Sequence, residues 1–181
     1  MRINLFDEIP RIEGDGIVLR RLTNADVSAL NELVSSPRVY RYLPTYLFEK
    51  QFDDQHQMIK ELYDTWFAAK ESIILGVEVR GDGGICGLAE FYGLREEIHK
   101  ISVGYRFLER SWGRGVATQT VHLMVDYLYT KTTIEVITAS TMVQNEASAR
   151  VLQKNDFIRT ARAVEEDWGY DTPTIADKWF C

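Results

Sequence analysis

The sequence predicts an α/β protein with one mixed, mostly antiparallel central sheet of about seven strands, flanked by about four helices. Two patterns along the chain support this prediction: short strand-like segments separated by turn-rich stretches, and helical periodicity of apolar residues in other segments. A length of 181 residues suits a single domain, which we take as residues 1–181. Helices packed on both faces of one sheet are the simplest layered solution for such a chain.

The first predicted elements are a strand at 16–22 and a helix that ends at about Val34. Thr23 can cap this helix, with Asp26 three residues later as an acidic variant of the capping box. Residues 35–50 contain two prolines and four aromatic residues, and we interpret them as an irregular segment. A second helix is expected within 53–70 from the helical spacing of Met58, Ile59, Leu62, Tyr63, Trp66 and Phe67.

The rest of the chain predicts a meander followed by alternating helices and strands. Three consecutive antiparallel strands are expected at 72–80, 85–94 and 101–108, joined by short turn-forming or polar loops. An apolar stripe then indicates a helix from about 116 to Tyr129. The remaining expected elements are a strand at 132–143, a short helix within 145–155 capped by Asn145, and two closing strands at 156–167 and 174–180.

Composition excludes several classes of function and suggests a compartment. The net charge of −6 argues against extended nucleic-acid binding, and no apolar run approaches the roughly 20 residues of a membrane span. Cys86 and Cys181 suggest neither a disulfide framework nor a metal site, so the cytoplasm is the expected compartment. His56, His99 and His122 lack metal-ligand spacing and are expected to be surface or packing residues, and no metal is predicted.

The stretch "ERSWGRGVAT" (109–118) places two glycines just before a predicted helix. Backbone N–H groups at a helix start lack partners, so Gly113 and Gly115 could let phosphate oxygens approach them, with Arg110 and Arg114 adding positive charge. The alternative is a plain strand-to-helix turn. A dinucleotide fingerprint is excluded because Thr118 stands where its third glycine or alanine belongs, and the Gly-Lys-Ser/Thr of a Walker loop is absent.

Taken together, several ordered motifs resemble the GNAT superfamily of acyl-CoA-dependent N-acetyltransferases, most closely its Rim-type branch of ribosomal-protein N-terminal acetyltransferases. They are "IVLRRLTNADVSALNELVSSPRVYRYLP", "ICGLAEF", "VGYRFLERSWGRGVAT", "NEASARVLQKNDF" and "DKWF", which span nearly the whole chain. The central signature falls on Arg110, Gly113 and Gly115, and Trp112 is typical of the branch. The resemblance implies the GNAT fold and acetyl-CoA as co-substrate.

The resemblance also implies where acetyl-CoA binds. Backbone groups of the strand end at Phe107 and Leu108 are expected to pair with the pantetheine arm. Asn145 matches an asparagine that touches the pantetheine, although a helix N-cap without ligand contact is an equal alternative. The amides expected to hold the pyrophosphate belong to Trp112, Gly113, Arg114, Gly115, Val116, Ala117 and Thr118.

The expected chemistry is direct attack of a neutral amine on the thioester within a ternary complex. Many family members protonate the departing thiolate with a tyrosine, but the matching position here is Leu152, so Ser148 is the preferred donor, with a local backbone contact as the alternative. Glu90 is the candidate base, because a carboxylate in an apolar strand needs a cleft or a partner; a solvent-facing position is the alternative. Ser102 replaces a glutamate that is frequent in the branch.

The acceptor is a primary amine, either of a protein N-terminus or of a small molecule. Tyr40, Tyr42 and Tyr46, with Phe48, lie where the family's acceptor groove forms, or else they anchor a packed loop. The acidic balance favours a cationic acceptor. No nucleic acid or membrane is expected as a partner, and the oligomeric state is open, a homodimer included. The rival function is a non-catalytic acyl-CoA sensor or interaction module.

Overall fold

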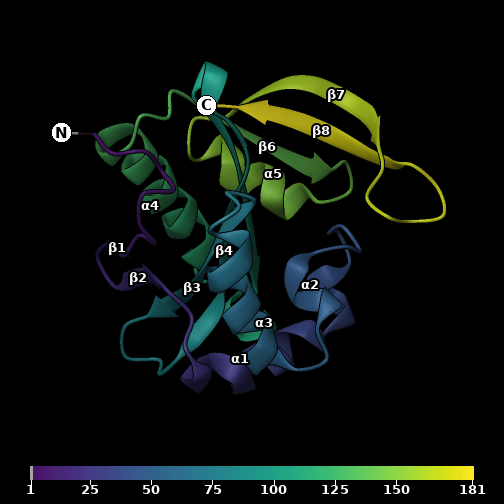
Figure 1. The fold of residues 1–181 in the computed structure, drawn as a ribbon. Helices are drawn as coiled ribbons and strands as arrows, with labels where there is room; N and C mark the ends of the chain where they lie inside the picture. Colours follow the sequence, from purple (N-terminus) through teal and green to yellow (C-terminus); the bar gives the residue numbers. More distant parts are fainter. Residues whose placement is uncertain (1) are drawn as a thin grey trace.

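The computed structural model describes residues 2–181 and contains one eight-stranded sheet. The strand order is β1-β2-β3-β4-β5-β6-β8-β7, and every neighbouring pair is antiparallel except β5 and β6 (Figure 1). The predicted mixed, mostly antiparallel sheet is therefore confirmed. The strands are β1 (Ile12–Glu13), β2 (Ile17–Arg20), β3 (Ser72–Val79), β4 (Ile85–Arg95), β5 (Lys100–Phe107), β6 (Val136–Met142), β7 (Ile158–Glu166) and β8 (Thr174–Phe180).

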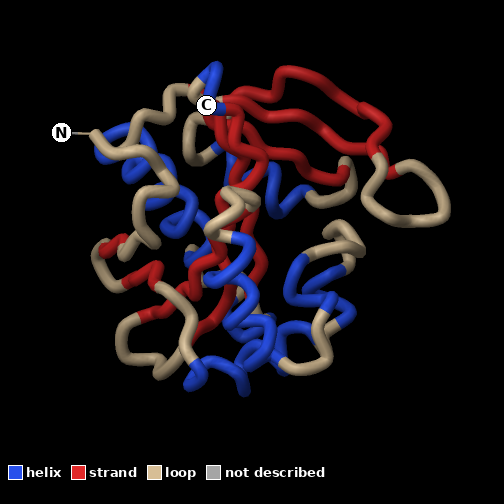
Figure 2. Tube along the Cα trace, viewed as in Figure 1, coloured by secondary structure: helices blue, strands red, loops and turns tan. Residues whose placement is uncertain are grey.

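Helices cover both faces of this sheet, as Figure 2 shows for the blue segments around the red strands. Each face has its own apolar core, one packed under α4 and α5 and the other under α1, α2 and α3. None of the described helices combines the length and the apolar character needed to cross a bilayer. The helices are α1 (Val27–Val34), α2 (Pro37–Tyr40), α3 (Gln55–Glu61), α4 (Val116–Lys131) and α5 (Glu146–Gln153).

The structure differs from the sequence prediction mainly in short elements. The two-residue strand β1 was not predicted, and α2 lies in the segment that we interpreted as irregular. Ser36 begins α2 by accepting a hydrogen bond from Val39 N, and Pro37 occupies the first helical position, where its missing N–H costs nothing. The strand predicted at 132–143 begins only at Val136, because Thr132 still ends α4.

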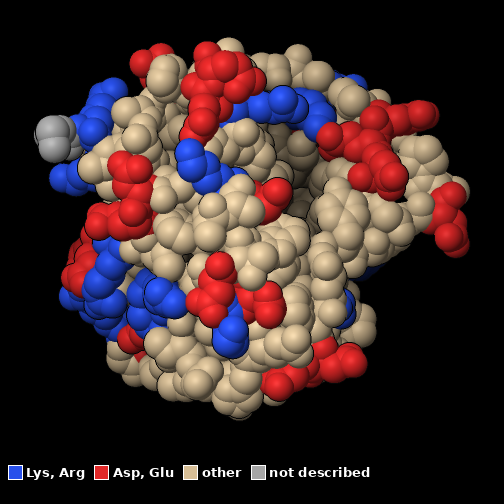
Figure 3. Space-filling model, in the orientation of Figure 1, with Lys and Arg blue, Asp and Glu red and all other residues tan. Residues whose placement is uncertain are grey.

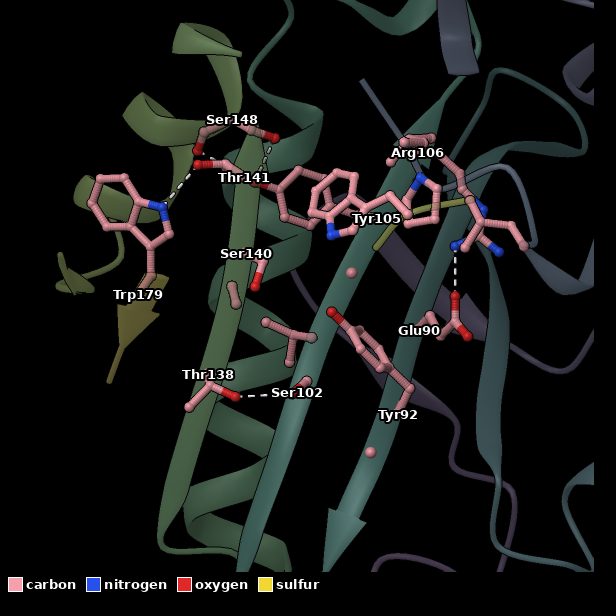
Figure 4. Close-up of a pocket in the computed structure, with 18 of the residues that line it drawn as sticks. Glu90, Tyr92, Ser102, Tyr105, Arg106, Thr138, Ser140, Thr141, Ser148 and Trp179 are labelled. Carbon is pink, nitrogen blue, oxygen red and sulfur yellow. Dashed lines mark hydrogen bonds and ion pairs between the residues drawn. The ribbon is translucent and has the colours of Figure 1, made fainter. Parts of the chain in front are cut away.

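The feature that creates the candidate functional site is the incomplete pairing of β5 with β6. Their parallel register covers only Lys100–Ser102 against Val136–Thr138. Beyond Ser102, β5 pairs only with β4, and β6 pairs only with β8. The two strands therefore diverge and leave a gap in the sheet, which Figure 4 shows between the strand carrying Ser102 and the strand carrying Ser140.

Candidate functional site

Two hollows open on either side of this gap and meet there. The larger, of about 740 Å³, lies between β5, β6, β8 and the segment 42–48; we call it the sheet cavity. The smaller, of about 480 Å³, lies between α2, the start of α4 and α5; we call it the helix groove. We call the residues that line both hollows the junction: Tyr42, Leu43, Tyr105, Arg106, Asn145 and Ser148.

The glycine loop forms one wall of the helix groove at the start of α4. Gly113 and Gly115 have φ angles of +71° and +77°, a left-handed conformation that other residues adopt at a cost. A Cβ atom on either glycine would stand in open space, so no protein atom fills the room in front of this loop. The first helical hydrogen bond of α4 runs from Gln119 N to the carbonyl oxygen of the N-cap residue Gly115, at 3.1 Å. The amides before Gln119 in the first turn have no acceptor within the helix.

The positive charge of the helix groove comes from residues that the sequence prediction missed. Arg38 and Arg41 line it from the α2 side, and Arg150 and Lys154 line it from α5. Arg38 is also paired with Glu109, and Arg150 with Glu146, on the exposed rim. These four cations are scattered over 117 positions of the chain, so only the fold shows that they converge. A long polyanion suits this combination of cations and a helix N-terminus.

Arg110 and Arg114, which were predicted to contribute this charge, are placed differently by the structure. The Arg110 guanidinium lies 2.6 Å from the Glu32 carboxylate, and that of Arg114 lies 2.7 Å from Asp82. Neither arginine lines the helix groove. Both are half-exposed surface ion pairs next to the glycine loop.

Phe107 lines the helix groove, but some main-chain groups at the end of β5 are already engaged within the chain. Phe107 O accepts a hydrogen bond from Trp112 Nε1 at 2.9 Å, and Leu108 N donates to Cys86 O at 2.9 Å. Leu108 itself is buried in the core beneath α1 and α3. Because successive residues of a strand direct their main-chain groups to alternate sides, the C=O of Val103 and the N–H and C=O of Tyr105 face the open part of the gap, beyond the last register pair with β6.

Ser148 lies in the first turn of α5, at the junction. Asn145 caps this helix by accepting a hydrogen bond from Ser148 N at 3.2 Å. The Ser148 hydroxyl donates to Tyr105 OH at 3.1 Å, so the two hydroxyls meet across the gap (Figure 4). Burial raises the pKa of Tyr105, which keeps its hydroxyl protonated. Leu152, one helical turn after Ser148, is fully buried.

Glu90 is buried in the floor of the sheet cavity rather than exposed to solvent. Arg106 NH1 donates to its carboxylate at 2.7 Å, as Figure 4 shows, and Arg106 NH2 donates to Glu49 at 2.5 Å. One buried guanidinium therefore faces two buried carboxylates. Burial, reinforced by the charge of Glu49, raises the pKa of Glu90 despite the opposing effect of Arg106.

The predicted aromatic residues divide between the cavity and its support. Tyr42 belongs to the junction, and Tyr46 and Phe48 line the sheet cavity. Tyr40 lines neither hollow; its hydroxyl lies beneath, donating to Glu49 at 2.7 Å, and burial raises its pKa. Its predicted contact with substrate is therefore replaced by a supporting role for Glu49.

A loop of the β7–β8 arm (158–180) closes one side of the sheet cavity. Thr45 N donates to Trp168 O at 2.9 Å, and Tyr170 OH donates to Leu43 O at 2.7 Å. These bonds tie the loop after α2 to the arm. Figure 3 shows acidic side chains gathered beside a hollow in the surface. The sequence of the arm includes Glu165, Glu166, Asp167 and Asp171.

The three histidines are exposed on separate elements. Within residues 2–181, no three His, Cys, Asp or Glu side chains gather as a metal ion would require.

Comparison with known proteins identifies the family. A model described as the acetyltransferase (GNAT) domain matches residues 17–158. The uncharacterised N-acetyltransferase YoaA of Bacillus subtilis is 26% identical over 82% of each chain.

Solved structures share the fold at low identity. RimL, a ribosomal L7/L12 α-N-protein acetyltransferase solved with coenzyme A, superposes with a TM-score of 0.79 at 15% identity, covering 95% of this chain and 97% of RimL. A spermidine N-acetyltransferase from Vibrio cholerae, solved with CoA and spermine, gives a TM-score of 0.75 at 17% identity, covering 93% and 96%. With most of its length matched by the family model and its whole architecture shared with such enzymes, this chain belongs to the GNAT family of N-acetyltransferases.

Proposed function

We propose that this enzyme transfers an acetyl group from acetyl-CoA directly to a primary amine, with both substrates bound at once. The observation that carries this proposal is the meeting of two hollows of different character at one junction. The helix groove is lined by four cations and a glycine loop, whereas the sheet cavity is lined by aromatic and hydroxyl groups above a buried carboxylate. A group held in one hollow can react with a group held in the other without an intermediate on the protein.

In this proposal the helix groove holds the phosphates of acetyl-CoA. The amides of 113–118 and the side chains of Arg150 and Lys154 face the anion, while the C=O of Val103 and the main-chain groups of Tyr105 pair with the pantetheine in the gap. Bound there, acetyl-CoA supplies an activated thioester carbonyl. A β5 backbone N–H stabilises the negative charge that develops on the carbonyl oxygen.

The junction and the floor of the sheet cavity carry the proton transfers. Ser148 donates the hydrogen that the departing sulfur needs, and Glu90 accepts the proton that the attacking amine loses. A raised pKa suits Glu90 for this role, since the carboxylate is then a stronger base than an exposed one. Tyr42, Tyr46 and Phe48 form the aromatic wall against which the acceptor packs.

The acceptor is an amine that is cationic in solution, either a protein N-terminus or a small molecule. The acidic residues of the β7–β8 arm and the overall charge of −6 both favour approach of a cation. The chain's relatives by structure include one enzyme named for spermidine and one for a ribosomal protein. We place the activity in the cytoplasm, which accords with the two free cysteines.

A CoA-release assay with acetyl-CoA and a panel of amines tests the proposal. The panel should contain peptides with free N-termini, polyamines, amino acids and aminoglycosides. We expect turnover with at least one cationic amine, and Ser148→Ala should reduce kcat by about 10²-fold. If calorimetry shows acetyl-CoA binding but no amine on a broad panel is turned over, the rival sensor function replaces the enzyme. If Ser148→Ala retains full turnover, Ser148 is not the proton donor.

A further inference from the structure

Tyr105 and Ser148 form a hydroxyl pair at the junction of the two hollows. The tyrosine comes from β5 and the serine from α5, 43 residues later in the chain. Both line the sheet cavity and the helix groove. A hydroxyl pair at this place lies beside any atoms that react across the junction.

The two hydrogen bonds of this pair are unequal. Ser148 Oγ donates to Tyr105 OH at 3.1 Å, and Tyr105 OH donates to the Ser148 carbonyl oxygen at 3.4 Å. Hydroxyl donors normally lie about 2.7–2.8 Å from their acceptors, so the second bond is weak. The Tyr105 proton can therefore turn from the carbonyl oxygen to Ser148 Oγ at little cost. The Ser148 proton is then free to point elsewhere.

The backbone around Ser148 is fixed while this exchange takes place. Asn145 Oδ1 accepts from Ser148 N at 3.2 Å, which holds the first turn of α5. Tyr105 is held on the other side of the gap by the pairing of β5 with β4, and its ring lies 6.1 Å from that of Phe107. Only the two hydroxyl protons need to move.

We propose that Tyr105 is a positioning residue for Ser148: its hydroxyl donates to Ser148 Oγ and so directs the serine proton to the sulfur that leaves during acetyl transfer. This inference rests on the proposed acetyl transfer. As the nitrogen–carbon bond forms and the carbon–sulfur bond breaks, the bond's electron pair goes to sulfur. Ser148 gives sulfur a proton and receives one from Tyr105. Glu90 takes the proton that the amine loses and then releases it to water, and water returns a proton to Tyr105, so the net change is one proton moved from nitrogen to sulfur.

The chain offers a matched control for removing the Tyr105 hydroxyl. Tyr127, on α4, also has a buried hydroxyl, which has no hydrogen-bond partner among the described residues. It lines neither the sheet cavity nor the helix groove. Tyr105→Phe and Tyr127→Phe therefore remove the same atom from two partly buried side chains, and only one of those side chains is at the junction.

The experiment compares wild type with Tyr105→Phe, Ser148→Ala, the double variant and Tyr127→Phe. Steady-state kinetics use the best amine from the panel, and a second measurement follows the ultraviolet absorbance of the thiolate of bound CoA against pH, with desulfo-CoA as the blank. We expect Tyr105→Phe to lower kcat about tenfold, the worth of one hydrogen bond, with the KM for acetyl-CoA unchanged. It should also raise the pKa of the bound CoA thiol. The double variant should be no worse than Ser148→Ala, because the tyrosine acts through the serine.

Two results would overturn the inference. One is a Tyr105→Phe enzyme with wild-type kcat and thiol pKa alongside an impaired Ser148→Ala enzyme, since Ser148 would then work without its partner. The other is a multiplicative loss in the double variant, which would make the two residues independent. Failure of the proposed function gives a different outcome. Either wild type would bind no CoA, or wild type would turn over no amine although Tyr105→Phe still raises the pKa of the bound CoA thiol.

Discussion

Replacing the glycines of the loop before α4 by alanine separates its conformational role from its role in binding. At Gly113 and Gly115 the φ angles exceed +70° and an added Cβ meets no protein atom. The cost in the free energy of unfolding is therefore left-handed strain alone, about 1–2 kcal/mol. For a chain of this size that corresponds to a fall in Tm of roughly 2–8 °C.

Gly16 provides the control, since it has a φ of +82° and equally open surroundings in the turn before β2, away from both hollows. All three alanine variants should lose similar stability in thermal melts. Only the two loop variants should also bind acetyl-CoA more weakly. Each added methyl group would displace a phosphate oxygen from a backbone N–H, a charged hydrogen bond worth about 1.5–3 kcal/mol, so Kd should rise roughly tenfold or more by calorimetry. Loop variants that melt like Gly16→Ala and bind like wild type would refute the phosphate site.

Three further outcomes are expected. Arg150→Gln and Lys154→Gln should each weaken acetyl-CoA binding severalfold and make it less dependent on salt. Arg114→Gln, outside the helix groove, should change neither the affinity nor its salt dependence. Equal effects from all three variants would show only a general effect of net charge. Burial raises the pKa of Glu90 in the folded protein. The contribution of Glu90 to the free energy of unfolding is therefore greatest at low pH and is lost as pH rises through the pKa of the folded state. Urea unfolding across pH should show this slope in wild type and lose it in Glu90→Gln; an unchanged slope would assign it to another group. Gly169→Ala would bring a Cβ against the Thr45 hydroxyl, in the loop after α2, and so loosen the contact between that loop and the arm. Proteolysis should therefore cut the β7–β8 loop faster than in wild type, and equal cutting would show that the loop adapts.

Elements with a long periodic pattern could be predicted from the sequence. The meander of β3, β4 and β5 follows from short, largely apolar segments separated by turn-forming or polar loops, and the helical stripe after Gly115 predicted α4. The strand β1 and the helix α2 escaped because two and four residues are too few to show a period. After α5 the chain turns through a left-handed position at Asp156, with φ +62°, a conformation that Asn and Asp tolerate better than most residues.

The site was only partly predictable, because its parts are brought together by tertiary structure. The glycine loop could be recognised locally, since its chemistry depends on neighbouring residues. The pairing of Tyr105 with Ser148 and the convergence of Arg38 with Lys154 depend on how β5, α2 and α5 pack, which no local pattern records. Glu90 lies between these cases: a carboxylate in an apolar strand signals a partner, but only the structure identifies it as Arg106.

The short parallel contact between β5 and β6 also has a mechanical consequence. Five strands lie before it and three after it, and three register pairs join the two portions. The two portions of the sheet are therefore hydrogen-bonded to each other at one end only. A linear molecule with amide groups, bound in the open part, would supply the hydrogen bonds of a missing strand. A molecule bound between β5 and β6 would join the two portions into one cooperatively folded unit. Amide hydrogens of β6, β8 and β7 should then exchange more slowly once CoA is bound, at positions far from any phosphate.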